Sequence, residues 1–301
     1  PTAVGKTDLI LSLFSGYAEV ISADSMQVYR GMDIGTAKPG HEVLQRIPHH
    51  LIDVRNPNEQ FTAGDFVHAA DMLVPAIAAR GRIPIISGGT AFYFKNYIFG
   101  LPQSPKGDKE IRLQLEAERR ELGLQALYEM LMECDPASAS RIHPSDSYRI
   151  LRALEVYRTT GKPLSSYEVP GEPRRDIKPL IIGLFRERAD LLSRIEWRVR
   201  KMFEKGLPGE VERLLQAGYR ANDPGMRGIG YREFFEEDLI PIKDNLQGED
   251  LPHERIIERI VIDSRRYAKR QLTFFRSLPN VIWVHAEDSE RVRSLVDEFL
   301  M

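Results

Sequence analysis

Residues 1–7 read PTAVGKT and end in the Gly-Lys-Thr of a phosphate-binding loop (P-loop), whose full motif is G-x-x-x-x-G-K-[ST]. In such a loop backbone N–H groups converge on phosphate oxygens, the lysine adds a positive charge, and the last hydroxyl is a ligand for Mg²⁺. Residues 7–14 then place polar and apolar side chains at helical spacing. The sequence therefore predicts a polyphosphate site at a helix N-terminus, without specifying ATP.

The motif lacks its first glycine, which would precede Pro1, and the strand that aims a P-loop at its ligand. A strand of ~5–6 residues and its lead-in predict roughly ten further residues upstream. This part of the phosphate cradle is the one that the sequence leaves incomplete.

Short buried strands alternate with amphipathic helices in the first hundred residues. Residues 18–23 and 83–87 are apolar runs typical of buried strands, and residues 65–79 carry an apolar stripe at helical spacing. This alternation favours a parallel sheet with helices on both faces. We predict an α/β fold, a P-loop NTPase-like parallel sheet flanked by helices.

A helical segment without strands interrupts this pattern. Residues 109–122, 125–134 and 146–159 have helical periodicity and lie between two stretches rich in proline and glycine. Residues 179–184 then resemble a strand that returns to the sheet, and further helices and a last strand follow. We predict an all-helical insertion domain over residues 105–168 inside a catalytic core formed by residues 1–104 and 169–301.

Composition excludes several classes of protein. The 301 residues are 42% hydrophobic and carry a net charge of −2, so the chain can bury a core, and its net charge does not indicate nucleic acid. Cys134 is the only cysteine, which excludes an internal disulfide and a cysteine-based zinc site and fits a reducing setting. No apolar run approaches the ~20 residues that span a bilayer. We expect a cytoplasmic monomer with no membrane partner.

An acidic residue, Asp24, ends the strand over residues 18–23. Ligands of open parallel sheets lie beyond the carboxyl ends of the strands, where the P-loop also opens. A carboxylate there can hold Mg²⁺ or accept a proton from a nucleophile, whereas the alternative is an aspartate that only caps a turn. Thr90 ends the run Gly88-Gly89-Thr90 at the same edge, where it belongs either to a phosphate site or to a plain turn.

Cationic side chains gather in three places. Residues 264–276 hold five cations, three aromatic residues and no acid, Arg149 and Arg152 share a helix face, and the loop 227–232 combines arginines with glycines and a tyrosine. Cations bind phosphates and aromatic rings stack on bases, so the three clusters predict a local surface for RNA. The alternative for each cluster is an ordinary solvated face.

Two further groups leave their roles open. Arg194 and Arg198 share a helix face, and the spacing does not say which of them reaches the phosphate. His49 and His50 are adjacent, so on a strand they point to opposite sides, and we interpret them as structural rather than as a metal pair.

The motifs together resemble the tRNA dimethylallyltransferase family, in its bacterial form. The resemblance covers nearly the whole chain in order, and it rests on residues 1–7, 22–29, 33–39, 49–53, 88–90, 152–157, 228–231 and 268–273. It implies transfer of a dimethylallyl group from dimethylallyl diphosphate to the exocyclic amine of the adenosine 3′ of the anticodon, in tRNAs that read codons beginning with U. It further implies Mg²⁺ as cofactor, diphosphate as the second product, and the tRNA anticodon stem-loop as partner, with its stem held by the insertion.

The resemblance also assigns roles to residues. Asp24 would be the general base, with Thr90 and Arg198 contacting the diphosphate, and Thr7 would be the Mg²⁺ ligand. The diphosphate would be bound by Thr2, Ala3, Val4, Gly5, Lys6 and Thr7. The tRNA would be contacted by Asp24, Ser25, Met26, Gln27, Tyr148, Arg149, Ile150, Leu151, Arg152, Arg227, Gly228, Ile229, Gly230, Tyr231, Arg232, Lys269, Arg270, Gln271, Leu272, Thr273, Phe274, Phe275 and Arg276.

Three other activities explain part of the sequence. A P-loop small-molecule kinase would use the P-loop and Asp24 but not the basic stretch 269–276. An adenylate isopentenyltransferase would take the same donor with a free nucleotide and needs no large RNA surface. An RNA-binding module with a degenerate P-loop would bind tRNA without forming a product.

Overall fold

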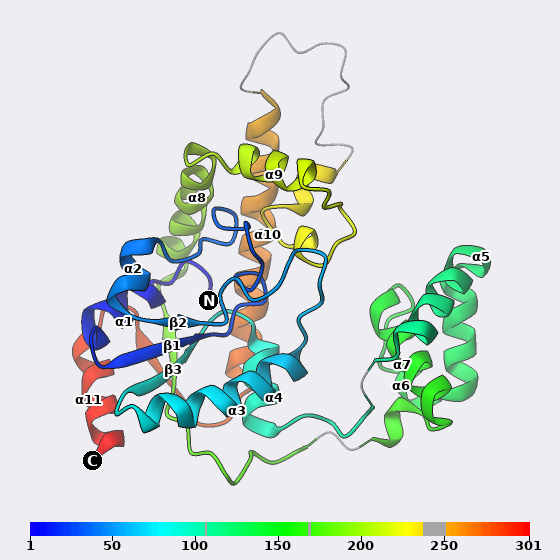
Figure 1. Cartoon of the computed structure of the whole chain (residues 1–301), viewed down its shortest axis with the longest axis horizontal. Coiled ribbons are helices and arrows are strands. Elements are labelled where there is room, and N and C mark those ends of the chain that lie inside the picture. The colour runs from blue at the N-terminus through cyan, green and yellow to red at the C-terminus, as the bar shows by residue number, and fades with distance from the viewer. Residues whose placement is uncertain (106, 168–169, 237–250) are drawn as a thin grey trace. The chain divides into compact units, whose positions relative to one another are not determined.

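The computed structural model describes residues 1–105, 107–167, 170–236 and 251–301. It divides into two compact units, residues 1–98 with 175–301 and residues 99–174 (Figure 1). The boundaries predicted from the sequence are 104/105 and 168/169, and residues 168 and 169 lie outside the described residues.

Three parallel strands form the sheet that positions the P-loop. They are β1 (Ala18–Ser22), β2 (His49–His50) and β3 (Ile83–Ser87), in the order β2-β1-β3. The central strand β1 is buried along its whole length, as expected for a parallel strand covered on both faces. Helices follow in the order α1 (Lys6–Phe14), α2 (His41–Arg46), α3 (Ala63–Ala79) and α4 (Ala91–Phe99). The predicted α/β fold is confirmed.

The strand predicted over residues 179–184 forms, but it does not join this sheet. It is β4 (Ile181–Phe185), and it pairs in parallel with β5 (Val281–His285) in a separate two-stranded sheet. The expected return to the first sheet is therefore wrong, because β4 finds its hydrogen-bonding partner in β5. The two sheets share an apolar core with α1 and with α11 (Ser289–Leu300).

Long helices cover the rest of the larger unit. They are α8 (Arg188–Glu204), α9 (Leu207–Gln216) and α10 (Leu251–Arg276), and short 3₁₀ turns lie at Gly225–Arg227 and Arg232–Phe235. Helices α8 and α10 pack along one another (Figure 1). They bring residues from the second half of the chain next to the P-loop at its start.

The smaller unit is helical in its described residues, with α5 (Lys109–Cys134), α6 (Pro136–Ala139), α7 (Ser147–Thr160) and a 3₁₀ turn at Leu164–Ser166. Helices α5 and α7 enclose an apolar core of leucine, isoleucine and alanine side chains. Gly123 has φ 84° inside α5, so the helix is broken at the place where the sequence predicts two separate helices.

Candidate functional site

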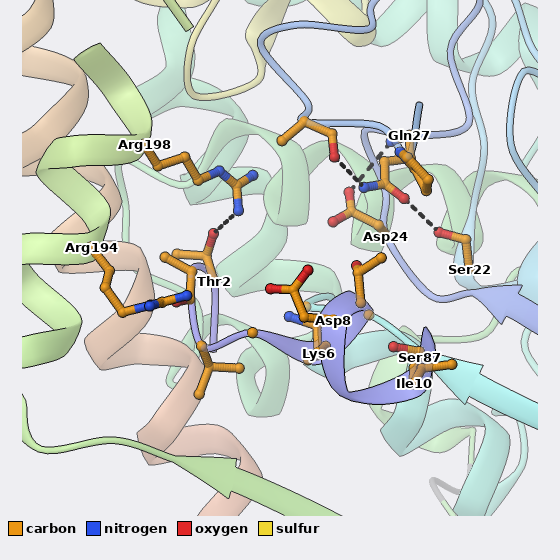
Figure 2. A pocket seen from close by; sticks show the side chains of 18 of the residues that line it. Thr2, Lys6, Asp8, Ile10, Ser22, Asp24, Gln27, Ser87, Arg194 and Arg198 are labelled. Carbon is orange, nitrogen blue, oxygen red and sulfur yellow. Dashed lines mark hydrogen bonds between the residues drawn. The ribbon is translucent and has the colours of Figure 1, made fainter. Parts of the chain in front are cut away.

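A cavity of about 650 Å³ opens at the carboxyl edge of the three-stranded sheet (Figure 2). Its walls come from the P-loop, from Asp24 after β1, from Gly88 and Gly89 after β3, and from Arg198 on α8. Residues 2–7, which the sequence predicts to bind diphosphate, all line it. The cavity therefore brings together groups that the sequence singles out separately.

Positive charge exceeds negative charge around the P-loop. The pKa of Lys6 is lowered to about 8, mainly by burial and also by the nearby charge of Arg198, while Asp24 opposes both effects. Burial also lowers the pKa of Arg198, again against the effect of Asp24. Asp24 thus offsets part of the charge of two desolvated cations, and an anion bound between them would relieve their mutual repulsion.

Asp24 caps a turn and lines the cavity at the same time. Its Oδ1 accepts hydrogen bonds from the backbone N–H groups of Met26 (2.9 Å) and Gln27 (3.4 Å). Its carboxylate nevertheless belongs to the cavity wall, across from Lys6 and Arg198 (Figure 2). The two interpretations of this residue are therefore compatible, because the turn holds the carboxylate in place.

Thr90 lies behind the cavity wall rather than on it. Its Oγ1 accepts the backbone N–H of Ser25 (2.9 Å) and donates to the Ser25 hydroxyl (3.2 Å). Gly88, two residues earlier, must lack a side chain, because a Cβ there would lie 2.1 Å from the carbonyl oxygen of Ala23. In this arrangement Thr90 fixes the segment that follows Asp24.

The two arginines that the spacing did not distinguish have different contacts. Arg198 Nη1 donates to Thr2 Oγ1 (3.2 Å), whereas Arg194 Nε donates to the carbonyl oxygen of Ala3 (3.0 Å). Arg186, which the sequence analysis did not single out, donates from Nε to the carbonyl of Val4 (2.9 Å). Arg194 and Arg186 therefore hold the backbone of the P-loop, and no local pattern in the sequence signals this role.

The basic stretch 269–276 divides between two faces of α10. Lys269, Arg270, Thr273 and Arg276 are exposed. Leu272 packs against the core around Ile195, and Phe275 lies edge-on to Phe94 with 5.4 Å between ring centres; Phe274 is half-buried and Gln271 is fully buried. The exposed cations face solvent, with Arg270 lying 5.9 Å over the Tyr267 ring, and the remaining side chains anchor the helix.

The loop 227–232 packs against the segment that follows Asp24. Arg227 is exposed, but Tyr231 is fully buried and its hydroxyl donates to Glu210 (2.6 Å). A Cβ at Gly228 would lie 2.1 Å from Met26 Cε, so this glycine allows the two segments to touch. Gly230 is also buried, Ile229 is half-buried in the core, and Arg232 pairs with Asp263 (2.6 Å).

Between Ser25 and Gln27, the side chains are half-buried. Gln27 accepts at Oε1 from the Ser22 hydroxyl (3.0 Å) (Figure 2). Gln27 is also the one of the three that lines the cavity. The segment predicted to contact the target base is therefore fixed by hydrogen bonds with Ser22 and Thr90 and by packing against Gly228.

In the smaller unit the predicted tRNA segment is only partly exposed. Tyr148 and Arg149 are exposed, whereas Ile150 and Leu151 are buried in the unit's core. Arg152 pairs with Glu155 (3.1 Å) and donates to the carbonyl of Pro105. Within this segment the exposed side chains available to a partner are those of Tyr148 and Arg149.

Comparison with known proteins places these features in one family. The model of the family described as IPP transferase matches residues 27–278. A tRNA dimethylallyltransferase 2 of Geotalea daltonii is 44% identical over 94% of this chain and 85% of its own length. A tRNA dimethylallyltransferase 1 of Syntrophotalea carbinolica is 42% identical over the whole chain and 94% of its own.

Solved structures give the same result. The tRNA isopentenylpyrophosphate transferase of Bacillus halodurans matches with a TM-score of 0.67 and 38% identity, over 100% of this chain and 93% of its own. A eukaryotic dimethylallyltransferase acting on tRNA matches with a TM-score of 0.78 and 26% identity, over 99% of this chain and 77% of its own. Among the described residues, no helix has the length and apolar character needed to cross a membrane.

Proposed function

This chain belongs to the tRNA dimethylallyltransferase family, and we propose that its cavity binds dimethylallyl diphosphate with the diphosphate on the P-loop. It is a transferase that modifies tRNA: a dimethylallyl group moves from its diphosphate to the exocyclic amine of the adenosine 3′ of the anticodon, in tRNAs that read codons beginning with U. The observation that carries the proposal is that the P-loop lies in one cavity with three cations, Lys6, Arg194 and Arg198, which outnumber its two carboxylates, Asp8 and Asp24.

The reaction needs a base and a good leaving group, because the lone pair of the adenine amine is delocalised into the ring. As the new carbon–nitrogen bond forms, the carbon–oxygen bond to the diphosphate breaks and Asp24 takes the proton from the amine. Lys6, Arg198 and the P-loop N–H groups stabilise the charge that grows on the diphosphate, an effect usually large in catalysis.

The oxygen donors beside the P-loop fit Mg²⁺. This ion commonly takes one or two protein oxygens together with phosphate oxygens and water, and Thr7 and Asp24 both line the cavity. The described residues contain no group of three metal-binding side chains that would suggest a different kind of metal site. When bound by Thr7 and the diphosphate, Mg²⁺ would neutralise charge on the leaving group.

We propose that the tRNA is contacted by the exposed cations of α10, by Arg227, and by Tyr148 and Arg149 of the smaller unit. The target adenine is stacked in the anticodon loop and must be extruded to reach a cavity. A monomeric state and a cytoplasmic location remain predictions from the sequence.

Calorimetric titration with dimethylallyl diphosphate, with and without Mg²⁺, tests the occupant of the cavity. We expect binding that Mg²⁺ strengthens and that Lys6→Ala weakens at least 10-fold, because the charge-assisted contact is lost. Lys162→Ala, which removes an exposed lysine of the smaller unit, is the matched control and should not change the affinity. A higher affinity for ATP than for dimethylallyl diphosphate, or an affinity that Lys6→Ala leaves unchanged, would contradict the proposal.

A further inference from the structure

Gln271 joins two loops of the active-site cavity. Its side chain comes from α10, is 3% exposed, and lies among the residues that line the cavity. Its Oε1 accepts the backbone N–H of Thr2 in the P-loop (2.8 Å), and its Nε2 donates to the carbonyl of Gly89 in the turn after β3 (2.7 Å). One amide thus bridges two segments that the sheet alone does not connect.

The bridge requires a side chain with a donor and an acceptor. The P-loop offers an N–H and the turn offers a carbonyl, so a neutral amide satisfies both, whereas a carboxylate satisfies only the first. The fit is close, because a Cβ at Gly89 would lie 2.4 Å from Gln271 Nε2. Tyr267, one turn earlier on α10, also donates to the Gly89 carbonyl (3.2 Å).

The turn that Gln271 holds is linked to the segment of the catalytic carboxylate by a hydrogen bond. Gly89 precedes Thr90, whose Oγ1 accepts the N–H of Ser25, and Ser25 follows Asp24. The P-loop is also fixed by Arg194 and Arg186, which donate to the carbonyls of Ala3 and Val4. Gln271 is therefore the contact that relates the phosphate cradle to the Asp24 side of the cavity.

We propose that Gln271 is a positioning residue for the transfer reaction, and that it sets the spacing between the P-loop and the Gly88–Thr90 turn rather than contacting tRNA. This inference rests on the proposed function of the cavity. It separates Gln271 from Lys269 and Arg270, which belong to the same segment of α10 but are exposed. Small displacements of reacting groups lower rates strongly, so loss of the bridge should affect the donor side of the reaction.

Steady-state kinetics of Gln271→Met test the proposal, because methionine keeps the size of the side chain and removes both hydrogen bonds. We expect KM for dimethylallyl diphosphate to rise about 10-fold and kcat to fall, with KM for an anticodon stem-loop within twofold of wild type. Arg270→Ala, one residue away, should give the reverse pattern. A rise confined to the stem-loop KM, or no change in either constant, would overturn the inference.

Gln271→Glu supplies a second signature that general destabilisation would not produce. A protonated glutamate can both donate and accept, as glutamine does, and burial raises the pKa of such a carboxyl. The activity of Gln271→Glu relative to wild type should therefore increase as the pH falls from 8 to 5.5, while the relative activity of Gln271→Met stays flat. A flat ratio for Gln271→Glu would count against the bridge.

If wild type itself forms no product, the proposed function fails, whereas wild-type transfer with an unchanged Gln271→Met removes only this inference.

Discussion

At the scale of single residues, the site depends on a few charged groups held by the backbone. Asp24 is oriented by the N–H groups of Met26 and Gln27, and Lys6 and Arg198 face it across the cavity. Lys6 and Asp24 were predictable because a P-loop lysine and an acid at a strand end are local patterns, whereas helical spacing alone did not separate Arg198 from Arg194. The family resemblance places Gln271 in the stretch 269–276 that contacts tRNA, and its hydrogen bond to Thr2, 269 positions away, leaves no local signal in the sequence.

Asp24→Asn should lower kcat at least about 100-fold, because an amide cannot take the proton from the amine. Asparagine retains the oxygen that accepts from Met26 and Gln27, so the turn should persist. Single-turnover transfer measures the effect, and the affinities for pyrophosphate and for the stem-loop serve as controls. Wild-type turnover in this variant would remove Asp24 as the base.

The affinity for pyrophosphate should fall as the pH rises above about 8, the pKa to which burial and Arg198 lower Lys6. Below this pH Lys6 carries the charge that binds the anion, and above it the free protein loses that charge, so the dissociation constant increases with pH. Lys6→Arg stays protonated and should flatten the dependence. Equal pH slopes in the two proteins, measured by calorimetry, would show that Lys6 does not titrate in this range.

At the scale of elements, the segments that the sequence assigns to binding contain two kinds of residue. Buried side chains support the fold, and exposed side chains can contact a ligand. The basic stretch 264–276 lies in α10, but only part of it is exposed. Strong periodicity made the long helices predictable. The two-residue strand β2 is too short for its sequence pattern to define it, and the pairing of β4 with β5 depends on contacts across a hundred residues.

Glu210 on α9 illustrates an element that supports the site from behind. Its buried carboxylate accepts from the N–H groups of Asp33, Ile34 and Gly35 and from the Tyr231 hydroxyl. Glu210→Ala would leave these donors unpaired and should reduce the free energy of unfolding by about 2–4 kcal/mol. Glu212→Ala, which removes an exposed carboxylate that accepts from Gln216, should change it by less than about 0.5 kcal/mol in the same urea titrations. Equal losses in both variants would refute this role of Glu210.

The exposed face of α10 should account for part of the salt dependence of tRNA binding. Replacing Arg270 and Arg276 with alanine should raise the dissociation constant and reduce the slope of log K against log salt by about 1–2, since each released counterion contributes ~0.7–0.9. Arg291→Ala on α11 is the matched surface control. An unchanged slope in the double variant would identify this face as merely solvated.

At the scale of the whole molecule, the near-neutral net charge conceals an uneven distribution. The cavity concentrates cations around the P-loop, α10 carries an exposed basic face, and the smaller unit exposes Tyr148 and Arg149. The order of the motifs along the chain was enough to indicate the family, because together they span nearly its full length. The contacts that brace the P-loop could not be predicted, because they join segments that only the folded chain brings together.

A transfer assay tests the central claim most directly. Labelled dimethylallyl diphosphate and Mg²⁺ are incubated with the protein and an unmodified anticodon stem-loop that carries adenosine 3′ of the anticodon, with AMP, or with ATP replacing the isoprenoid, in parallel reactions. The account predicts label in the stem-loop alone, with release of diphosphate. Label in AMP, or turnover of ATP without any prenylated RNA, would contradict it.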